Sequence, residues 1–190
     1  MSHFIVAVFV DKVRELEVSR LLAPYDETLV VPHVISKEDL IRNERSHFER
    51  HKDTYYKESP ERLNWSDEDF YKYAIRYIDE DKILPDGSVE ENYNPNSKWD
   101  WWEIGGRWSG MINGDDSARV GDVIDTLPDD FVTYAVVTPD GLWHAPGEMG
   151  WFGCSTDTDL EWDEWQRNYK KRYLDTADPN WHIFIVDCHI

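Results

Sequence analysis

Two near-continuous apolar runs, one at each end of the chain, constrain the fold most. Residues 3–10 read His-Phe-Ile-Val-Ala-Val-Phe-Val, and residues 181–187 read Trp-His-Ile-Phe-Ile-Val-Asp. Runs of this kind predict strands in the middle of a sheet that is covered on at least one face. Since each strand must pair its backbone N–H and C=O groups, the sequence predicts that both terminal runs lie in one sheet.

A central hairpin extends the predicted sheet. Residues 131–137 form a third apolar run, which enters a Pro-Asp-Gly turn at 139–141 and returns through residues 142–145. A turn of this composition between two apolar runs is typical of a β-hairpin. Residues 106–112 are expected to add a short strand.

Three helix starts are marked by a hydroxyl side chain with a carboxylate three residues later. The pattern begins at Ser36, Ser66 and Thr158 and predicts a helix directly after each of them. Four aromatic side chains then recur on one face of the third helix: Trp162, Trp165, Tyr169 and Tyr173. This spacing favours a core-facing stripe over a cofactor site. Residues 11–22 are expected to form a further helix.

These elements predict an α+β fold with a single, mostly antiparallel sheet that includes both terminal strands. The helices are expected mainly on one face of the sheet, and residues 37–80 are expected to form an inserted helical segment. A length of 190 residues suffices for one self-sufficient core. Because the chain shows no repeat and no low-complexity linker, the sequence predicts a single domain over 1–190.

The composition of the chain limits the cellular compartments and the classes of binding partner that are expected. Two cysteines, Cys154 and Cys188, no secretory signal and no apolar run of about 20 residues predict a cytoplasmic protein without a membrane span. The formal charge of −19 opposes phosphate backbones, so no direct nucleic-acid binding is expected. Between Arg119 and Arg167 there are eleven acidic residues and no Lys or Arg. This stretch is interpreted either as a solvated face or as a decoy that imitates DNA.

The segment 94–110 contains four of the ten tryptophans beside cationic side chains and a Gly-Gly pair. One interpretation is a turn that is held in place because its tryptophans pack against a small core. The other is a pocket whose aromatic faces and cations hold a small polar or nucleotide-like ligand. The predicted ligand-binding residues are Asn94, Lys98, Trp99, Asp100, Trp102 and Arg107, with Trp151 contributed by a glycine-rich loop over 147–153.

The C-terminal Asp187-Cys188-His189 sequence suggests further chemistry. Adjacent strand residues point to opposite faces, so Cys188 and His189 are not expected to form a thiolate pair, and Cys188 is interpreted as a structural thiol. No recognised metal spacing or nucleotide-binding motif occurs, so no metal site is expected and no cofactor is identified. Asp100, Glu103, Asp187 and His189 would form a hydrolytic centre if the fold brought them together.

Five segments carry a resemblance to a known family: 22–28, 94–108, 116–122, 147–153 and 186–190. Their Asn-Pro-Asn-Ser-Lys-Trp-Asp-Trp-Trp-x-Ile-Gly-Gly-Arg-Trp motif and Val-Asp-Cys-His-Ile terminus resemble an uncharacterised family of bacterial and bacteriophage proteins. The resemblance implies one shared architecture and an origin on a phage or another mobile element. It transfers no established activity.

Three functional hypotheses follow. The first is a cytoplasmic binding protein with a Trp-rich ligand pocket, for which a role in countering a host defence protein would suit a phage origin. The second is an acidic decoy that inhibits a host nucleic-acid-binding protein. The third is a hydrolase or nuclease that uses Asp, Glu and His side chains, so the sequence leaves open whether the protein is an enzyme.

Overall fold

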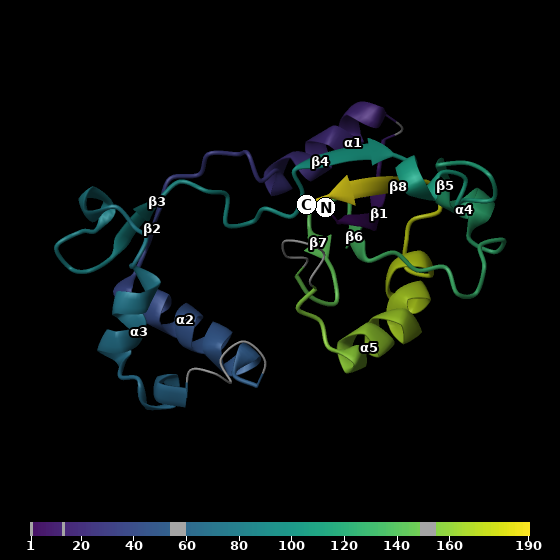
Figure 1. Ribbon diagram of the computed structural model, residues 1–190. Helices are drawn as coiled ribbons and strands as arrows, with labels where there is room; N and C mark the ends of the chain where they lie inside the picture. The colour runs from purple at the N-terminus through teal and green to yellow at the C-terminus, as the bar shows by residue number, and fades with distance from the viewer. Residues whose placement is uncertain (1, 13, 54–59, 149–154) are drawn as a thin grey trace. The chain divides into compact units, whose positions relative to one another are not determined.

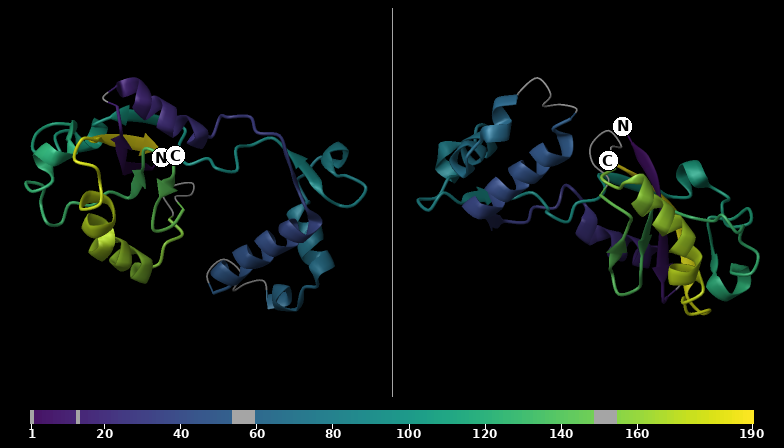
Figure 2. Two further views of the ribbon diagram at one scale, coloured as in Figure 1. Left: turned by 180° about the vertical axis from the view of Figure 1, so that it is seen from behind. Right: turned by 90° about the horizontal axis from the view of Figure 1, so that it is seen from below.

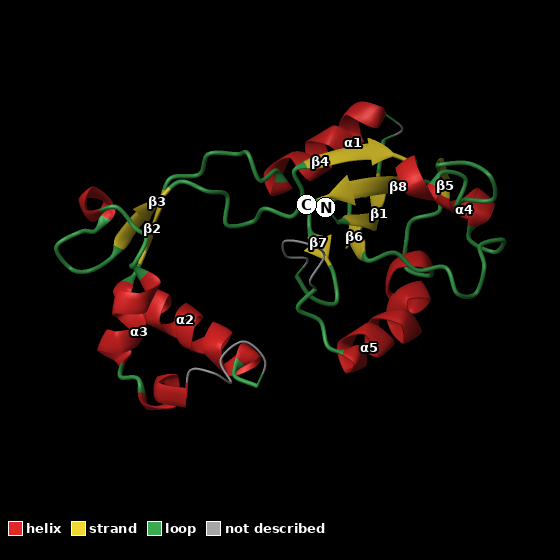
Figure 3. Cartoon of the chain, viewed as in Figure 1, coloured by secondary structure: helices red, strands yellow, loops and turns green. Residues whose placement is uncertain are grey.

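The computed structural model describes residues 2–12, 14–53, 60–148 and 155–190, which form two compact units. Unit 1 combines Met1–Leu29 with Asn94–Ile190, and unit 2 is Val30–Tyr93. The described hydrophobic clusters each lie within one unit. Figure 3 shows that strands dominate the centre of unit 1, whereas unit 2 is mainly helical.

Unit 1 is built on a mixed, mostly antiparallel sheet. Its described strands are β1 (His3–Val10), β4 (Trp101–Ile104), β5 (Ser117–Arg119), β6 (Ala135–Val137), β7 (Trp143–His144) and β8 (His182–His189). The strand order is β4-β8-β1-β6-β7, with β5 also paired to β8 (Figure 1). Among these strands β1 and β6 run parallel, and the other pairs are antiparallel.

The two terminal strands are direct neighbours, which confirms the α+β prediction with both ends in one sheet. β1 and β8 pair antiparallel along their whole length, from His3 opposite His189 to Val10 opposite His182. The two chain ends therefore lie close together, as both views of Figure 2 show. The predicted hairpin is also present, since β6 and β7 pair antiparallel across the turn.

Helices cover both faces of this sheet. On one face, here called the α1 face, Phe4, Val6 and Val8 of β1 pack with α1 (Glu15–Leu22). On the opposite α5 face, Ala7 and Phe9 pack with α5 (Asp159–Tyr169) (Figure 1). The expectation that the helices lie mainly on one face is therefore wrong for unit 1. The physical reason is that β1 and β8 are apolar on both sides, so each face needs a cover.

Helix α5 begins and packs as the sequence predicts. Thr158 and Glu161 form a reciprocal capping box, and Trp165 and Tyr169 are buried in the core. The indole Nε1 of Trp165 donates to the carbonyl of Thr133 at 2.8 Å, so the buried ring loses no hydrogen bond. The helix then continues as a five-residue π-helix, η6 (Lys170–Leu174).

Two local predictions need correction. The strand expected over 106–112 is wrong, because the chain forms a 3₁₀ turn, η4 (Gly106–Trp108). Gly105 and Gly106 have φ of +74° and +53°, which no strand accommodates. The strand expected over 131–137 is shorter than predicted and begins only at Ala135. The remaining short elements of unit 1 are η1 (Ala23–Tyr25) and α4 (Val120–Val123).

Unit 2 contains the helices predicted after Ser36 and Ser66. They are α2 (Lys37–His51) and α3 (Asp67–Ala74), and each cap side chain accepts a backbone N–H. The other described elements are β2 (His33–Ile35), β3 (Val89–Glu91), η2 (Pro60–Asn64) and η3 (Glu80–Lys82). Leu40, Tyr71 and Val89 form their shared core. Across the described residues of both units, the structure contains no helix with the length and apolar character needed to cross a membrane.

Candidate functional site

The tryptophans of the Trp-rich segment have different environments. Trp99 is 7% exposed and donates from Nε1 to the carbonyl of Leu22 at 3.1 Å. Trp102 packs edge-on against Trp99 and contacts the core on the α1 face. Trp101 points the other way along β4 and is 46% exposed. Trp99 and Trp102 thus anchor the segment, while Trp101 offers an aromatic surface to solvent.

Two more predicted binding residues contact other parts of the chain. Asn94 is 2% exposed, and its Nδ2 donates to the carbonyls of Pro24 and Asp26. Lys98 lies near Glu148, with 3.5 Å between Nζ and Oε1. Both N–H bonds of the Asn94 amide are therefore used inside the protein. The predicted residue Trp151 lies outside the described residues.

The Gly-Gly pair allows the chain to approach two aspartates closely. A Cβ added to Gly105 would lie 2.4 Å from Asp116 Oδ2, and one added to Gly106 would lie 2.4 Å from Asp187 Cβ. Asp187 Oδ2 accepts the backbone N–H of Arg107 at 3.0 Å. No larger residue at position 106 would let the Arg107 amide reach this carboxylate without a shift of the chain.

Two histidine–aspartate pairs meet where the terminal strands adjoin. His3 Nδ1 lies 2.8 Å from Asp187 Oδ1, and His189 Nδ1 lies 2.6 Å from Asp100 Oδ1. The two imidazole centroids are 5.0 Å apart, with an interplanar angle of 69°. His3, Asp100, Asp187 and His189, together with Trp101, are called the terminal-histidine site below. Two residues predicted from the sequence as parts of a hydrolytic centre, Asp100 and His189, are thus in direct contact.

Strand pairing builds this site. His3 lies opposite His189 across β1 and β8, and His189 lies opposite Trp101 across β8 and β4. Directly opposite residues share a sheet face, so these three rings form one row. The next row contains Asp187 and Glu103, which are likewise opposite each other. Glu103 is therefore near Asp187 on the same face, and its side chain is exposed.

The two imidazoles differ in the surroundings of Nε2, the ring nitrogen that does not face the aspartate. Because a carboxylate only accepts hydrogen bonds, Nδ1 of His3 carries the proton toward Asp187, and Nε2 is the free position of the neutral ring. Nε2 of His3 forms no hydrogen bond with a described residue, and the side chain is 17% exposed. Nε2 of His189 is buried and has no hydrogen-bond partner in the described part of the chain. His3 is therefore the imidazole that can meet a ligand.

An aromatic ring lies beside His3, and the backbone of Arg107 binds the same aspartate as His3 does. The ring of Trp101 lies edge-on to His3, with 6.1 Å between their centroids. Arg107, whose amide binds Asp187, has an exposed side chain. Its guanidinium forms no hydrogen bond or ion pair with any residue in the described part of the chain. Asp100 pairs with His189 and not with Arg107. The Arg107 guanidinium is therefore available to bind a ligand.

Arg107→Lys is expected to leave the free energy of unfolding unchanged, since an exposed, unpaired guanidinium contributes little to the fold. Trp108→Ala is expected to lower it, but by less than the roughly 3–5 kcal/mol of a fully buried indole. Trp108 is only partly buried against the core on the α5 face. Denaturant melts of both variants measure the difference. An equal loss of stability in the two variants would make Arg107 a structural residue.

The remaining cysteine and acidic residues are placed as follows. Cys188 is fully buried in the α1-face core, and burial raises the pKa of its thiol well above the ordinary value. It thus points away from His189, as strand alternation predicts. Of the eleven acidic residues between Arg119 and Arg167, ten are exposed and Asp157 is half-buried. In the described residues, no group of three or more His, Cys, Asp and Glu side chains is arranged to hold a metal ion.

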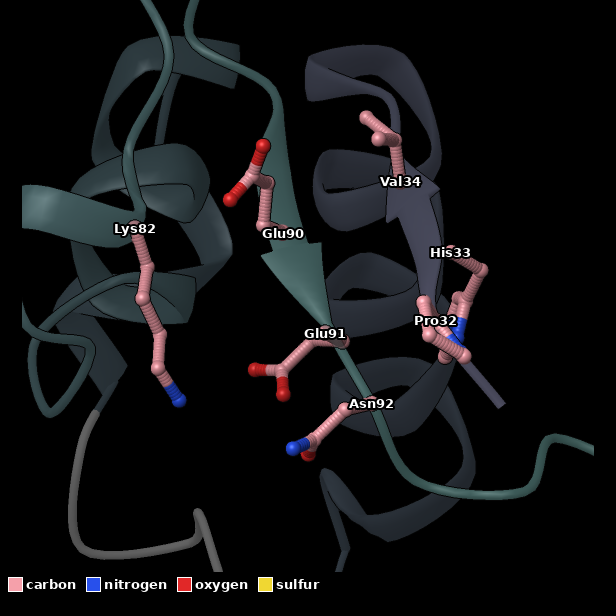
Figure 4. A pocket seen from close by; sticks show the side chains of 7 residues that line it. All are labelled: Pro32, His33, Val34, Lys82, Glu90, Glu91 and Asn92. Atoms are coloured by element: carbon pink, nitrogen blue, oxygen red, sulfur yellow. The ribbon is translucent and has the colours of Figure 1, made fainter. Parts of the chain in front are cut away.

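Pockets lie elsewhere in both units. A cavity of about 430 Å³ lies in unit 2 and is lined by residues at β2 and β3 and by Lys82. Figure 4 shows these side chains. Glu91 and Lys82 extend into the same space in this view. A second cavity, of about 360 Å³, lies between β7 and α5 in unit 1. Neither cavity is lined by a binding residue that the sequence predicted.

No family model, curated protein or solved structure matches this chain. Sequence reasoning missed His3 and Trp101 as site residues. Register could have found His3: if the terminal strands pair antiparallel end to end, His3 must lie opposite His189. Trp101 joins them only through the pairing of β4 with β8.

Proposed function

We propose that the protein is a hydrolytic enzyme that uses His3 as a general base on a small polar or nucleotide-like substrate. The observation that carries this proposal is the environment of one imidazole. Its Nδ1 is held by the buried carboxylate of Asp187, while its Nε2 has no partner among the described residues. This is the arrangement in which a carboxylate fixes the tautomer and the orientation of a catalytic histidine.

The chemical step uses one proton. His3 Nε2 takes a proton from water as the water oxygen bonds to the electrophilic centre of the substrate. The resulting imidazolium then returns that proton to the leaving oxygen when the bond to it breaks. Asp187 stays ionised throughout and stabilises the imidazolium, because the two groups lie 2.8 Å apart.

Asp187 acts as a positioning residue, because its carboxylate is held on both oxygens. One oxygen accepts from His3 and the other accepts from the Arg107 amide. The side chain is 1% exposed, so water cannot easily replace these partners. His189, itself held by Asp100, packs against the His3 ring and limits its rotation.

The substrate would be held by groups around His3. Trp101 supplies a half-exposed aromatic face on which a flat ring can stack. The exposed guanidinium of Arg107 can bind a phosphate or carboxylate through two parallel hydrogen bonds. These groups support a nucleotide-like substrate, and two residues of the predicted ligand-binding set are linked to the site: Asp100 through His189, and Arg107 through its backbone N–H to Asp187.

The proposed cellular location and biological role of this activity rest on the resemblance to bacterial and bacteriophage proteins. Four segments that carry it make contact in space: Trp99 bonds to Leu22, Gly105 lies against Asp116, and Asp100 bonds to His189. Their convergence supports a shared functional centre in proteins with these segments. We propose that the protein works in the host cytoplasm, and that its substrate belongs to a host defence response.

The test is turnover of a nucleotide panel by the wild type and matched variants. The panel contains nucleoside triphosphates, 2′,3′-cyclic nucleotides and dinucleoside phosphates, with products separated by chromatography. His3→Gln is expected to lower kcat/KM by about 10²–10⁴-fold, the usual contribution of a positioned general base. His33→Gln, a half-buried histidine of unit 2, is the control and should retain full activity.

A second measurement does not depend on the choice of substrate. Diethyl pyrocarbonate modifies accessible, unprotonated imidazole nitrogens, and mass spectrometry locates the adducts. His3 should react because its Nε2 is free, whereas His189 should resist because its Nε2 is buried. An unreactive His3, together with no turnover of any panel member, would refute the proposal.

A further inference from the structure

The cavity of about 360 Å³ between β7 and α5 has the composition of a built site. Its polar lining comes from His144 on β7, from Glu161 and Glu164 on α5, and from Arg172 and Tyr173 in the π-helix η6. None of these residues belongs to the terminal-histidine site. The cavity therefore has no role in the hydrolytic step proposed above.

Hydrogen-bond donors and acceptors both remain free in this cavity. Glu164 and Arg172 pair at 3.1 Å, yet both side chains are more than half exposed, so each keeps atoms for a ligand. Glu161 uses Oε2 for the helix cap and leaves Oε1 available. The hydroxyl of Tyr173 forms no hydrogen bond with a described residue. Burial raises the pKa of Tyr173, which keeps that hydroxyl protonated as a donor.

Two of the lining side chains come from the π-helix η6. In η6 the N–H of Asp175 bonds to the carbonyl of Lys170, five residues earlier. A π-helical turn is rare and occurs often at functional sites, because it changes the direction of the side chains that follow. Here Arg172 and Tyr173, both within η6, line the cavity beside the last β-strand of the hairpin.

Aromatic rings form the wall behind the polar groups. Tyr173 lies between His144 and Trp165, with ring centroids 5.5 and 5.2 Å away. Trp143 lines the same cavity from β7. Trp165 is buried, so a ligand can contact only the partly buried rings of Trp143 and Tyr173. Two such rings beside carboxylates and a guanidinium match a ligand ring that has C–H groups on its face and hydroxyls at its edge. Each hydroxyl both donates and accepts, so it can satisfy both kinds of polar group.

We propose that this cavity binds a neutral sugar ring. A phosphate or carboxylate ligand would meet Glu161 and Glu164 in a protein of net charge −19. An apolar ligand would leave the cavity's charged groups desolvated without partners. A neutral polyhydroxylated ring avoids both costs, and about 360 Å³ lies within the range of small-molecule sites.

Titrations with glucose, galactose, N-acetylglucosamine and maltose test this inference, by calorimetry and by tryptophan fluorescence. Sorbitol, which has hydroxyls but no ring, and AMP, which carries phosphate, are the comparison ligands. Millimolar binding of at least one sugar is expected, with little dependence on salt. Tyr173→Phe keeps the ring and is expected to weaken that binding about fivefold, the effect of losing one hydrogen bond.

Glu164→Gln should also weaken sugar binding, whereas Asp163→Asn should not. The control removes the same charge from the neighbouring residue of α5, which does not line the cavity. Three outcomes would overturn the proposal: no sugar binds at millimolar concentration, sorbitol or AMP binds more tightly than every sugar, or Asp163→Asn weakens binding as much as the two cavity variants. Because no cavity residue belongs to the terminal-histidine site, the result of the nucleotide-turnover assay does not depend on whether the cavity binds a sugar.

Discussion

Removal of the last six residues, 185–190, is expected to unfold unit 1. This truncation deletes most of β8, which lies between β1 and β4 in the sheet. Ile185, Val186 and Cys188 are 0% exposed; Ile185 belongs to the core on the α5 face, and Val186 and Cys188 belong to the core on the α1 face. Burial of each such apolar side chain contributes about 1.5–3 kcal/mol, so the loss approaches the whole stability of a typical domain, about 5–15 kcal/mol.

The measurement is circular dichroism with a thermal melt, recorded for the full chain and for the truncated chain. Removal of Ile190 alone is the control, because this residue follows β8 and is only partly buried. The control should melt cooperatively at a slightly lower temperature. A chain without residues 185–190 that kept the wild-type transition would show that the terminal strands do not hold the sheet together.

Gly106→Ala is expected to lower the free energy of unfolding by about 2–5 kcal/mol. A φ of +53° costs an L-residue roughly 1–2 kcal/mol, and forcing a methyl group into a packed site costs about 1–3 kcal/mol more. The added Cβ would lie 2.4 Å from Asp187 Cβ, so that carboxylate must move away from Arg107 and His3. The same variant should therefore also lower any activity that depends on His3.

Gly141→Ala separates the two causes. Gly141 also has a positive φ, +86°, but nothing lies within 4 Å of an added Cβ. Its substitution should cost only the conformational part, about 1–2 kcal/mol. Denaturant melts of the two variants give the difference directly. Equal losses would mean that the close approach to Asp187 contributes nothing, and that the Gly-Gly pair serves only the backbone turn.

Local patterns predicted the helices well. The caps at Ser36, Ser66 and Thr158 form as expected, because a hydroxyl that accepts a nearby backbone N–H is an interaction within four residues of sequence. The short strand expected over 106–112 does not form, because contacts with distant residues decide the backbone conformation there. Its residues are compatible with a strand, but the close approach to Asp116 and Asp187 requires positive φ at two glycines.

The candidate site was only partly predictable. Asp100 and Arg107 stand out because they lie in a segment of unusual composition, and His189 because it follows Asp187 and Cys188. His3 has no such local signal, since it is one polar residue at the start of an apolar strand. Its partner Asp187 is 184 positions away, and only the antiparallel register of β1 and β8 brings the two together.

The sequence by itself determined the three capped helices and the two terminal strands, and it predicted that these strands share a sheet. Periodic apolar residues and helix caps act over a few positions, so these features can be read locally. Tertiary structure alone decided that helices cover both faces, that Trp99 is an anchor while Trp101 is exposed, and that His3 meets Asp187. These outcomes depend on strand order and register, which are set by packing between residues far apart in the chain.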